Sequence, residues 1–314
     1  MTENECLQRM VAPCQRRPGV WLGGIIQIWV TARCARACVH CTQGCNLQAD
    51  RPDITREQFR HACRCLADYW GVVGIFGGNP CLHPQFPELC AIAREYVPRK
   101  QLGLWTDDFC GHGEVVRRTF NPHVSNVNAH GDPAKAAALR RAWPEQDRIL
   151  GATADSLHSP VWVALCDVIN DESKRWELIS RCDVNQRWSA ITLPVRGKLQ
   201  VYFCEIAGAM AQLHPEWPEL GLPCRPGWWK EGIETWREQV QWYCHRCGIP
   251  LRLPAAPSNS DAPELATETH AAVLRLRRRR ELRIIRSLAE IGVDRETLSE
   301  KPATDYLPEA HVEI

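Results

Sequence analysis

Three cysteines in one short segment of the chain have the spacing of a metal-binding loop. Cys34, Cys38 and Cys41 form a C-x3-C-x2-C pattern, and cysteine thiolates are the usual ligands of iron–sulfur clusters. A [4Fe–4S] cluster normally takes four cysteines, so three of them leave one iron open to a substrate or a second cofactor. If the loop instead binds zinc, Cys45 could supply a fourth ligand. The alternatives are a zinc site, which favours C-x2-C or C-x4-C pairs, and a set of buried thiols.

A second group of cysteines occurs in the C-terminal half of the chain. Cys244 and Cys247 form a C-x2-C knuckle, in which both sulfurs can reach the same metal. Upstream, two β-rich segments predict a hairpin flanked by Cys182 and Cys204, and Cys224 follows it. A structural zinc site of four cysteines uses the same kind of knuckle, so zinc and a cluster are both compatible with this group.

The elements around the first cysteine loop alternate between strands and helices. Residues 25–30, directly before the loop, are apolar and β-branched, which predicts a buried strand. The expected strands are 25–30, 72–76, 101–106, 124–128, 148–152 and 161–168, and the expected helices are 53–69, 87–96, 113–120 and 133–143. This alternation predicts an α/β fold with a parallel sheet.

Sites in parallel α/β sheets and barrels form at the carboxyl ends of the strands. That rule nominates five polar residues as lining residues: Thr106, Asp107, Asn128, His130 and His158. For each of them, a purely structural hydrogen-bonding role is an equal alternative.

The strand expected at 72–76 ends in Gly77-Gly78-Asn79-Pro80. Glycines at such a position allow the backbone to approach a ligand closely. Taken alone, this segment is typical of an ordinary turn. The segment lies one βαβ unit after the cysteine loop, and the two motifs at this spacing are a far more specific signal of function than either motif alone.

Together, the C-x3-C-x2-C loop and the Gly-Gly-Asn-Pro segment resemble the signature of the radical SAM superfamily. The resemblance implies a partial (β/α)6 barrel of the TIM type, with a [4Fe–4S] cluster on Cys34, Cys38 and Cys41. It also implies that the amino and carboxylate groups of S-adenosylmethionine (SAM) chelate the open iron. The residues implied to contact SAM are His40, Gly77, Gly78, Asn79, Pro80, Thr106 and Asn128.

The chain departs from the family pattern at two of these residues. His40 stands where an aromatic residue is common, and the substitution keeps a planar ring that we expect near the adenine. Asn79 stands at the acidic position of the family's GGEP motif. An amide oxygen still accepts a hydrogen bond from the ammonium group of SAM, but without a full charge, so we expect a weaker affinity for SAM.

The activity implied by the resemblance is reductive cleavage of SAM to a 5′-deoxyadenosyl radical. This radical would abstract hydrogen from an unidentified substrate, which is a small polar molecule, a nucleotide or a peptide. The expected electron donor is reduced flavodoxin or ferredoxin. Three alternatives stay open: a radical SAM isomerase, an enzyme that modifies a nucleotide or DNA base, and a non-catalytic, metal-stabilised module that binds nucleic acid.

The second cysteine group resembles the Twitch domain, the shortened form of the SPASM domain, which binds an auxiliary [4Fe–4S] cluster. The resemblance implies Cys182, Cys204, Cys244 and Cys247 as ligands, with Cys224 as a spare or as a replacement for Cys182. Two [4Fe–4S] clusters are therefore expected. The family often has Gly-x4-Cys in the hairpin, whereas here Gly197 precedes Cys204 by seven positions.

Size and composition agree with an enzyme that binds metal inside the cell. The chain has 314 residues, 17 cysteines and a net charge of +1, so the overall charge does not indicate binding to nucleic acid or membrane. It begins with a polar, acidic stretch and contains no apolar run of membrane-spanning length. We therefore expect a cytoplasmic protein with no membrane contact, in which a high cysteine content indicates metal binding.

The sequence predicts five consecutive regions. These are an N-terminal lead-in (1–20), a radical SAM partial barrel (21–180), a Twitch-like auxiliary cluster domain (181–250), a flexible linker (251–268) and a basic C-terminal helix with a tail (269–314). The helix carries four consecutive arginines, 277–280, and either contacts nucleic acid or an acidic protein or packs on the barrel. We expect deletion of residues 256–314 to leave both cysteine sites intact.

Overall fold

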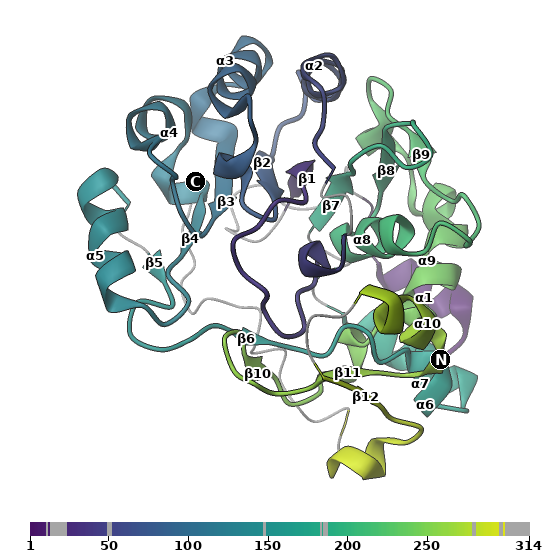
Figure 1. Ribbon diagram of the computed structural model, residues 1–314. Helices are drawn as coiled ribbons and strands as arrows, with labels where there is room; N and C mark the ends of the chain where they lie inside the picture. Colours follow the sequence, from purple (N-terminus) through teal and green to yellow (C-terminus); the bar gives the residue numbers. More distant parts are fainter. Residues whose placement is uncertain are drawn as a thin grey trace.

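The structure, a computed structural model, describes residues 1–10, 12, 24–48, 52–146, 149–182, 184, 188–277, 281–294 and 298. A mixed α/β arrangement is built on one sheet of eight strands in the order β5-β4-β3-β2-β1-β7-β8-β9 (Figure 1). The strands of this sheet are β1 (Ile25–Thr31), β2 (Val72–Gly77), β3 (Leu102–Thr106), β4 (Asn126–Asn128), β5 (Ile149–Leu150), β7 (Trp188–Ile191), β8 (Gln200–Tyr202) and β9 (Leu222–Pro223).

Strands β1 to β5 are parallel to their neighbours, and β7 continues the parallel part on the other side of β1. The last two strands, β8 and β9, are antiparallel. Two smaller sheets each contain two strands. They consist of β6 (Leu157–His158) with β10 (Ala256–Pro257), and of β11 (Glu264–Ala266) with β12 (Leu282–Ile284).

Strand β1 lies in the middle of the sheet and leads directly into the cysteine loop. Ile25 pairs with Val72 of β2 on one side and with Trp188 of β7 on the other. All seven residues of β1 are buried, as expected for a parallel strand that is covered on both faces. The cysteine loop, which starts after Thr31, therefore follows a strand that is hydrogen-bonded to a neighbour on each side.

Figure 1 shows α2 to α5 as an arc outside strands β1 to β5. The α-helices are α1 (Glu3–Arg9), α2 (Arg56–Cys65), α3 (Phe86–Tyr96), α4 (Gly113–Thr119), α5 (Pro133–Ala142), α6 (Leu165–Val168), α7 (Glu172–Ser180), α8 (Glu205–Leu213), α9 (Arg237–Tyr243) and α10 (Glu268–Arg277). Short 3-10 helices are η2 (Cys45–Leu47), η3 (Pro80–Leu82), η4 (Arg99–Gln101), η5 (Pro122–Val124), η7 (Trp228–Lys230), η8 (Ile233–Trp236), η9 (Cys244–Arg246), η10 (Ile249–Leu251) and η11 (Leu288–Ile291).

The first long helix, α2, begins where its sequence predicts. Thr55 is the N-cap, and its side chain accepts from the N–H of Gln58 while the Gln58 side chain accepts from the N–H of Thr55. This capping box satisfies two backbone donors that the helix itself leaves unpaired. Phe59, Ala62 and Cys63 form the buried face, so α2 packs against the sheet.

The sixth strand lies elsewhere than expected. Residues 161–168 form a turn followed by α6, and β7 instead is the sixth strand in the parallel part of the sheet. The carbonyl oxygens of Val161 and Trp162 accept from the N–H groups of Gly248 and Thr267. The backbone of this apolar segment is thus paired with later parts of the chain. Hydrophobicity alone cannot separate such a buried loop from a buried strand.

The C-terminal part of the chain also differs from the expectation. Helix α10 ends at Arg277, and residues 282–284 form β12 where a continuous helix was expected. Residues 256–257, expected in a flexible linker, pair with β6, and Ser258 beside them is fully buried. Residues 278–280, which carry three of the four consecutive arginines, lie outside the described part of the chain.

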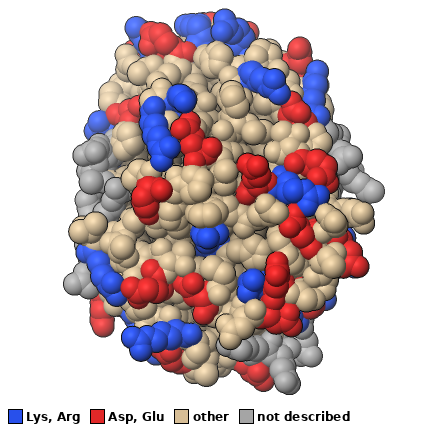
Figure 2. All heavy atoms as spheres, turned by 90° about the vertical axis from the view of Figure 1, so that its right-hand side faces the viewer, with Lys and Arg blue, Asp and Glu red and all other residues tan. Residues whose placement is uncertain are grey.

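On the face shown in Figure 2, basic and acidic side chains are interspersed, and neither sign dominates. No helix in the described part of the chain combines the length and the apolar character needed to cross a membrane.

Candidate active site

The carboxyl ends of the parallel strands surround a cavity of about 390 Å³. This volume lies within the range of small-molecule sites, roughly 300 to 1,000 Å³. Cysteines of the loop after β1 line one wall, and the ends of β2, β3 and β4 line another. Lining residues used below are Cys34, Arg36, Cys38, Cys41, Cys45, Gly77, Gly78, Thr106, Asp107, Asn128, His130, Ser156, His158 and Glu205.

The thiols of the first cysteine loop lie close enough to influence one another electrostatically. Burial, reinforced by the neighbouring thiols, raises the pKa of Cys34 to about 11 and that of Cys38 to about 12. The Cys45 thiol donates a hydrogen bond to the Cys41 sulfur and lowers the pKa of Cys41 to about 7. Without a metal, Cys34 and Cys38 are therefore protonated at neutral pH, and only metal ligation would keep all of these sulfurs as thiolates.

The two glycines at the end of β2, Gly77 and Gly78, are required by the cysteine loop itself. A Cβ atom on Gly77 would lie 2.2 Å from the carbonyl oxygen of Thr31, and one on Gly78 would lie 2.2 Å from that of Arg33. The N–H groups of Gly78 and Asn79 donate to these same oxygens at 2.9 and 2.7 Å. Backbone hydrogen bonds at the Gly77-Gly78 segment therefore hold the end of β2 against the end of β1 and the start of the cysteine loop. Both glycines also line the cavity.

Both the nitrogen and the oxygen of the Asn79 side-chain amide are hydrogen-bonded to neighbouring residues. Its Nδ2 donates to Oδ1 of Asp107 at 2.9 Å, and its Oδ1 accepts from the Cys81 N–H and the Thr106 hydroxyl, each at 2.9 Å. Neither Asn79 nor Pro80 is among the lining residues. A carboxylate here would face the carboxylate of Asp107, which gives a physical reason for the amide at this position.

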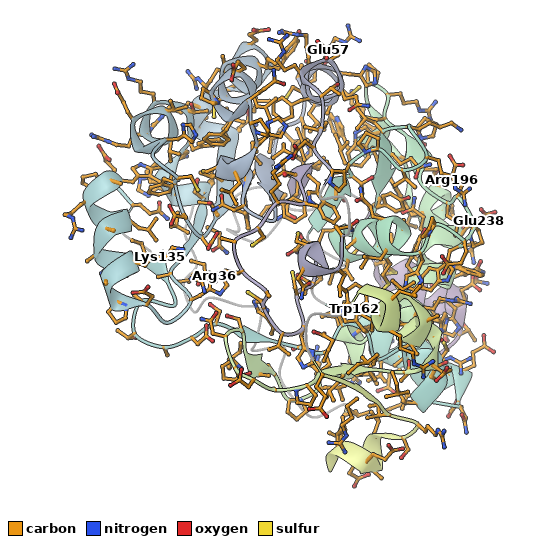
Figure 3. All side chains as sticks on the ribbon, viewed as in Figure 1. Arg36, Glu57, Lys135, Trp162, Arg196 and Glu238 are labelled. Carbon is orange, nitrogen blue, oxygen red and sulfur yellow. The ribbon has the colours of Figure 1, made fainter. Side chains whose placement is uncertain are left out.

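Asp107 holds the rim of the cavity together. Its Oδ2 accepts from Nε of Arg36 at 2.9 Å and from Nζ of Lys135 at 3.0 Å, and Figure 3 shows these two basic side chains next to each other. Burial by itself would raise the pKa of Asp107, but Lys135 and Arg36 outweigh it and the net shift is downward. The carboxylate thus stays ionised and fixes the cysteine loop through Arg36, which lies between Cys34 and Cys38.

His40 has a different partner from the one expected. Its Nδ1 lies 2.9 Å from Oε1 of Glu264, and its backbone N–H donates to Oε2 of the same residue at 3.1 Å. Both side chains are buried, and His40 is not among the lining residues. The ring therefore anchors the cysteine loop to β11 and does not face the cavity.

Residues 256–264, called here the tail segment, contact the cysteine loop, although their sequence predicted only part of a flexible linker. The carbonyl oxygen of Ser258 accepts from the N–H of Val39 at 3.0 Å, and Oδ1 of Asn259 accepts from Nη1 of Arg36 at 2.9 Å. Together with the hydrogen bonds between Glu264 and His40, these contacts attach the cysteine loop to the tail segment. Proline- and serine-rich composition indicated only a loop, and no sequence signal reports such long-range contacts.

His130 and His158 both line the cavity, as expected. Nδ1 of His130 lies 2.8 Å from the Ser258 hydroxyl, which donates onward to Oδ1 of Asp155 at 2.7 Å. Burial, followed by the charge of Arg36, lowers the pKa of His130 to about 4. His130 is therefore neutral at neutral pH, with its Nδ1–H donated to the tail segment.

Four cysteines of the second group surround a separate, small cavity of about 20 Å³. These are Cys182, Cys204, Cys244 and Cys247. The N–H groups of Ile206 and Ala207, at the start of α8, donate to the Cys204 sulfur, although burial still raises the pKa of Cys204 to about 12. Cys224 is not in this group, since its thiol donates to Cys65. The structure therefore groups Cys182 with the other three.

The spread of the sulfurs bears on the choice of metal. In the part of the chain that the structure describes, no three thiols of either group lie mutually within 4.8 Å. Sulfurs around one zinc ion are roughly 3.8 Å apart, given a Zn–S distance of about 2.3 Å. The described thiols of the two groups therefore lack the compact spacing of three ligands around a single zinc ion.

Of the seven residues implied to contact SAM, four line the cavity and three do not. Gly77, Gly78, Thr106 and Asn128 are lining residues, whereas His40, Asn79 and Pro80 are buried beside it. Arg36, Ser156 and Glu205 also line it, although no motif in the sequence marks them as site residues.

Comparison with known proteins finds only distant similarity, to solved structures. No family model matches the chain, and no curated protein matches it. The solved structures that it resembles include BtrN in complex with AdoMet and 2-DOIA, at 14% identity and a TM-score of 0.44, covering 71% of this chain and 92% of that one. They also include a selenomethionine form of BtrN in an open conformation, at 13% identity and a TM-score of 0.41, covering 74% of this chain and 94% of that one.

Proposed function

We propose that this protein is a radical SAM enzyme whose active site is the 390 Å³ cavity. One observation carries the proposal: the three cysteines of the C-x3-C-x2-C loop and the Gly77-Gly78 strand end line the same cavity, although 35 or more residues separate them along the chain. The cavity lies at the carboxyl ends of parallel strands, where α/β folds bind ligands.

Cys34, Cys38 and Cys41 would hold a [4Fe–4S] cluster, and Gly77, Gly78, Thr106 and Asn128 would contact SAM. When bound, the reduced cluster and SAM supply a 5′-deoxyadenosyl radical that takes hydrogen from the substrate. The protein's own contribution is orientation and exclusion of water. The Asp107–Arg36 pair fixes the loop on one side, and the tail segment closes it on the other.

Cys182, Cys204, Cys244 and Cys247 would hold an auxiliary [4Fe–4S] cluster. Four cysteine ligands leave no open iron, so this cluster is suited to electron transfer and not to binding substrate. Apolar residues around the small cavity, among them Phe203, Ile206 and Met210, keep water away from it, and such a shell tunes the reduction potential. Reduced flavodoxin or ferredoxin is the proposed electron donor.

The test is anaerobic reconstitution followed by an assay for 5′-deoxyadenosine. We expect about eight irons per chain, as follows from two clusters, and cleavage of SAM under dithionite. Cys34→Ala, Cys38→Ala and Cys41→Ala should each abolish cleavage and retain about four irons. Cys63→Ala, which removes a buried thiol outside both groups, is the matched control.

Two outcomes would contradict this assignment. Formation of 5′-deoxyadenosine by a variant that carries Cys34→Ala, Cys38→Ala and Cys41→Ala together would mean that the site lies elsewhere. About four irons together with one zinc would retain the SAM site and reject the auxiliary cluster. Whether SAM is consumed or regenerated separates an oxidoreductase from an isomerase.

A further inference from the structure

Outside the two cysteine groups, three further side chains converge between α2 and the strand β9. The ligand atoms of His61, Cys65 and Cys224 all lie within 4.8 Å of one another. Cys65 and Cys224 are buried, and His61 is partly exposed. This is the compact spacing that the two cysteine groups lack, and it is close to the separation of ligands around one ion.

The local structure aims these groups at one point. His61 and Cys65 are four residues apart on α2 and therefore lie on one face of the helix. Nε2 of His61 lies 3.7 Å from the Cys65 sulfur and donates to the carbonyl oxygen of Cys224 at 2.8 Å. Cys224 approaches from the chain that follows β9, and Figure 1 shows α2 and β9 beside each other at the upper right.

The group of His61, Cys65 and Cys224 is open to solvent on the side that faces a second cavity. Glu57, one turn before His61 on α2 and labelled in Figure 3, lines a second cavity of about 520 Å³ together with His61, Glu219 and Cys224. A metal held by the three protein groups would thus have its fourth position directed toward water or the Glu57 carboxylate. Three protein ligands from cysteine and histidine with one open position are an established coordination pattern for zinc.

We propose that His61, Cys65 and Cys224 form a zinc-binding site distinct from both cysteine groups. The bound zinc would link helix α2, which packs on the parallel sheet, to Cys224, which directly follows the antiparallel strand β9. A soft, borderline ion such as zinc is favoured by two thiolates and one imidazole over Mg²⁺ or Ca²⁺, which prefer oxygen ligands.

Zinc binding would release protons from the two cysteine ligands. The Cys224 thiol donates a hydrogen bond to the Cys65 sulfur, and the ion would replace this proton and the proton of the Cys65 thiol. Both protons go to solvent. The His61 proton moves from Nε2 to Nδ1, and Nε2 gives up its hydrogen bond to the Cys224 carbonyl oxygen to bind the ion. Nδ1 now accepts from Arg64 at 3.2 Å, and the Arg64 side chain is exposed, so it can turn away when the ion binds.

The experiment measures zinc binding by full-length, iron-reconstituted protein in competition with a chromophoric chelator. One zinc per chain is expected, with affinity that rises with pH because two protons are released. Cys224→Ser and His61→Ala should each weaken binding at least tenfold, while the iron content stays at the wild-type value. Cys63→Ser, a buried thiol on the same helix, should bind zinc like the wild type.

A second probe reports the ligands directly. Co²⁺ in place of zinc should give the intense visible bands of a tetrahedral site and a sulfur-to-metal charge-transfer band, both lost in Cys224→Ser. Equal zinc affinity in wild type and variants would overturn the proposal. So would a disulfide between Cys65 and Cys224, found by peptide mass spectrometry, that persists in anaerobically purified protein.

Discussion

Replacing Glu264 with alanine should weaken the attachment of the cysteine loop to the tail segment. The Glu264 carboxylate accepts two hydrogen bonds from His40, at 2.9 Å from the ring and at 3.1 Å from the backbone. His40 is only 2% exposed, so water cannot replace the lost acceptor. Each buried group left unsatisfied costs about 1–3 kcal/mol, and we expect the free energy of unfolding to fall by about 2–4 kcal/mol.

Equilibrium unfolding of the metal-free protein in urea, followed by tryptophan fluorescence, measures this loss. The reconstituted variant should also lose iron from the C-x3-C-x2-C loop, because His40 directly precedes Cys41. Glu264→Gln keeps one acceptor oxygen and should fall between alanine and wild type. Glu268→Gln is the surface control, since Glu268 is 74% exposed and its ion pair with Arg275 is 3.4 Å long. Wild-type stability and wild-type iron content in Glu264→Ala would refute the reasoning.

Three further changes test other contacts of the site. Asn79→Asp places a carboxylate where an amide donates to Asp107 at 2.9 Å, so it should destabilise the fold by about 2–4 kcal/mol at neutral pH. The loss should become smaller as the pH falls and one of the two carboxyls is protonated, as urea unfolding against pH would show. Gly78→Ala brings a Cβ atom to 2.2 Å from a backbone carbonyl and should lower the melting temperature and the iron content, whereas Gly232→Ala, which meets nothing within 4 Å, should leave both unchanged. Deleting residues 256–314 should reduce the iron retained by the first cysteine loop, and deleting 299–314 alone should not.

The truncation reverses the expectation drawn from the sequence. A stretch rich in proline, serine and alanine without periodicity indicates a linker, and such a linker could be removed without effect. In the structure, Ser258 is fully buried and Glu264 is 5% exposed, and both contact the cysteine loop. Composition describes the local preference of a segment but not the surface on which the segment packs.

The sequence predicted the parallel part of the sheet well because each strand and helix carries its own local signal. The apolar strand β1, the Thr55 capping box of α2 and the cysteine loop between them depend on residues that are close in sequence. The hairpin of β7 and β8 was expected for the same reason, and it is present. The expected strand over 161–168 was wrong because a buried loop and a buried strand have the same hydrophobicity.

The candidate ligands of the first group, Cys34, Cys38 and Cys41, were indicated by the sequence alone, since cysteine spacing on one loop limits which sulfurs can share a metal. Tertiary structure decided everything that depends on contacts between distant segments. It placed Cys182 with Cys204, Cys244 and Cys247, directed Cys224 toward α2, and turned His40 toward Glu264. A side chain's partner depends on which surfaces meet after folding, and residue type and local spacing carry no information about that meeting.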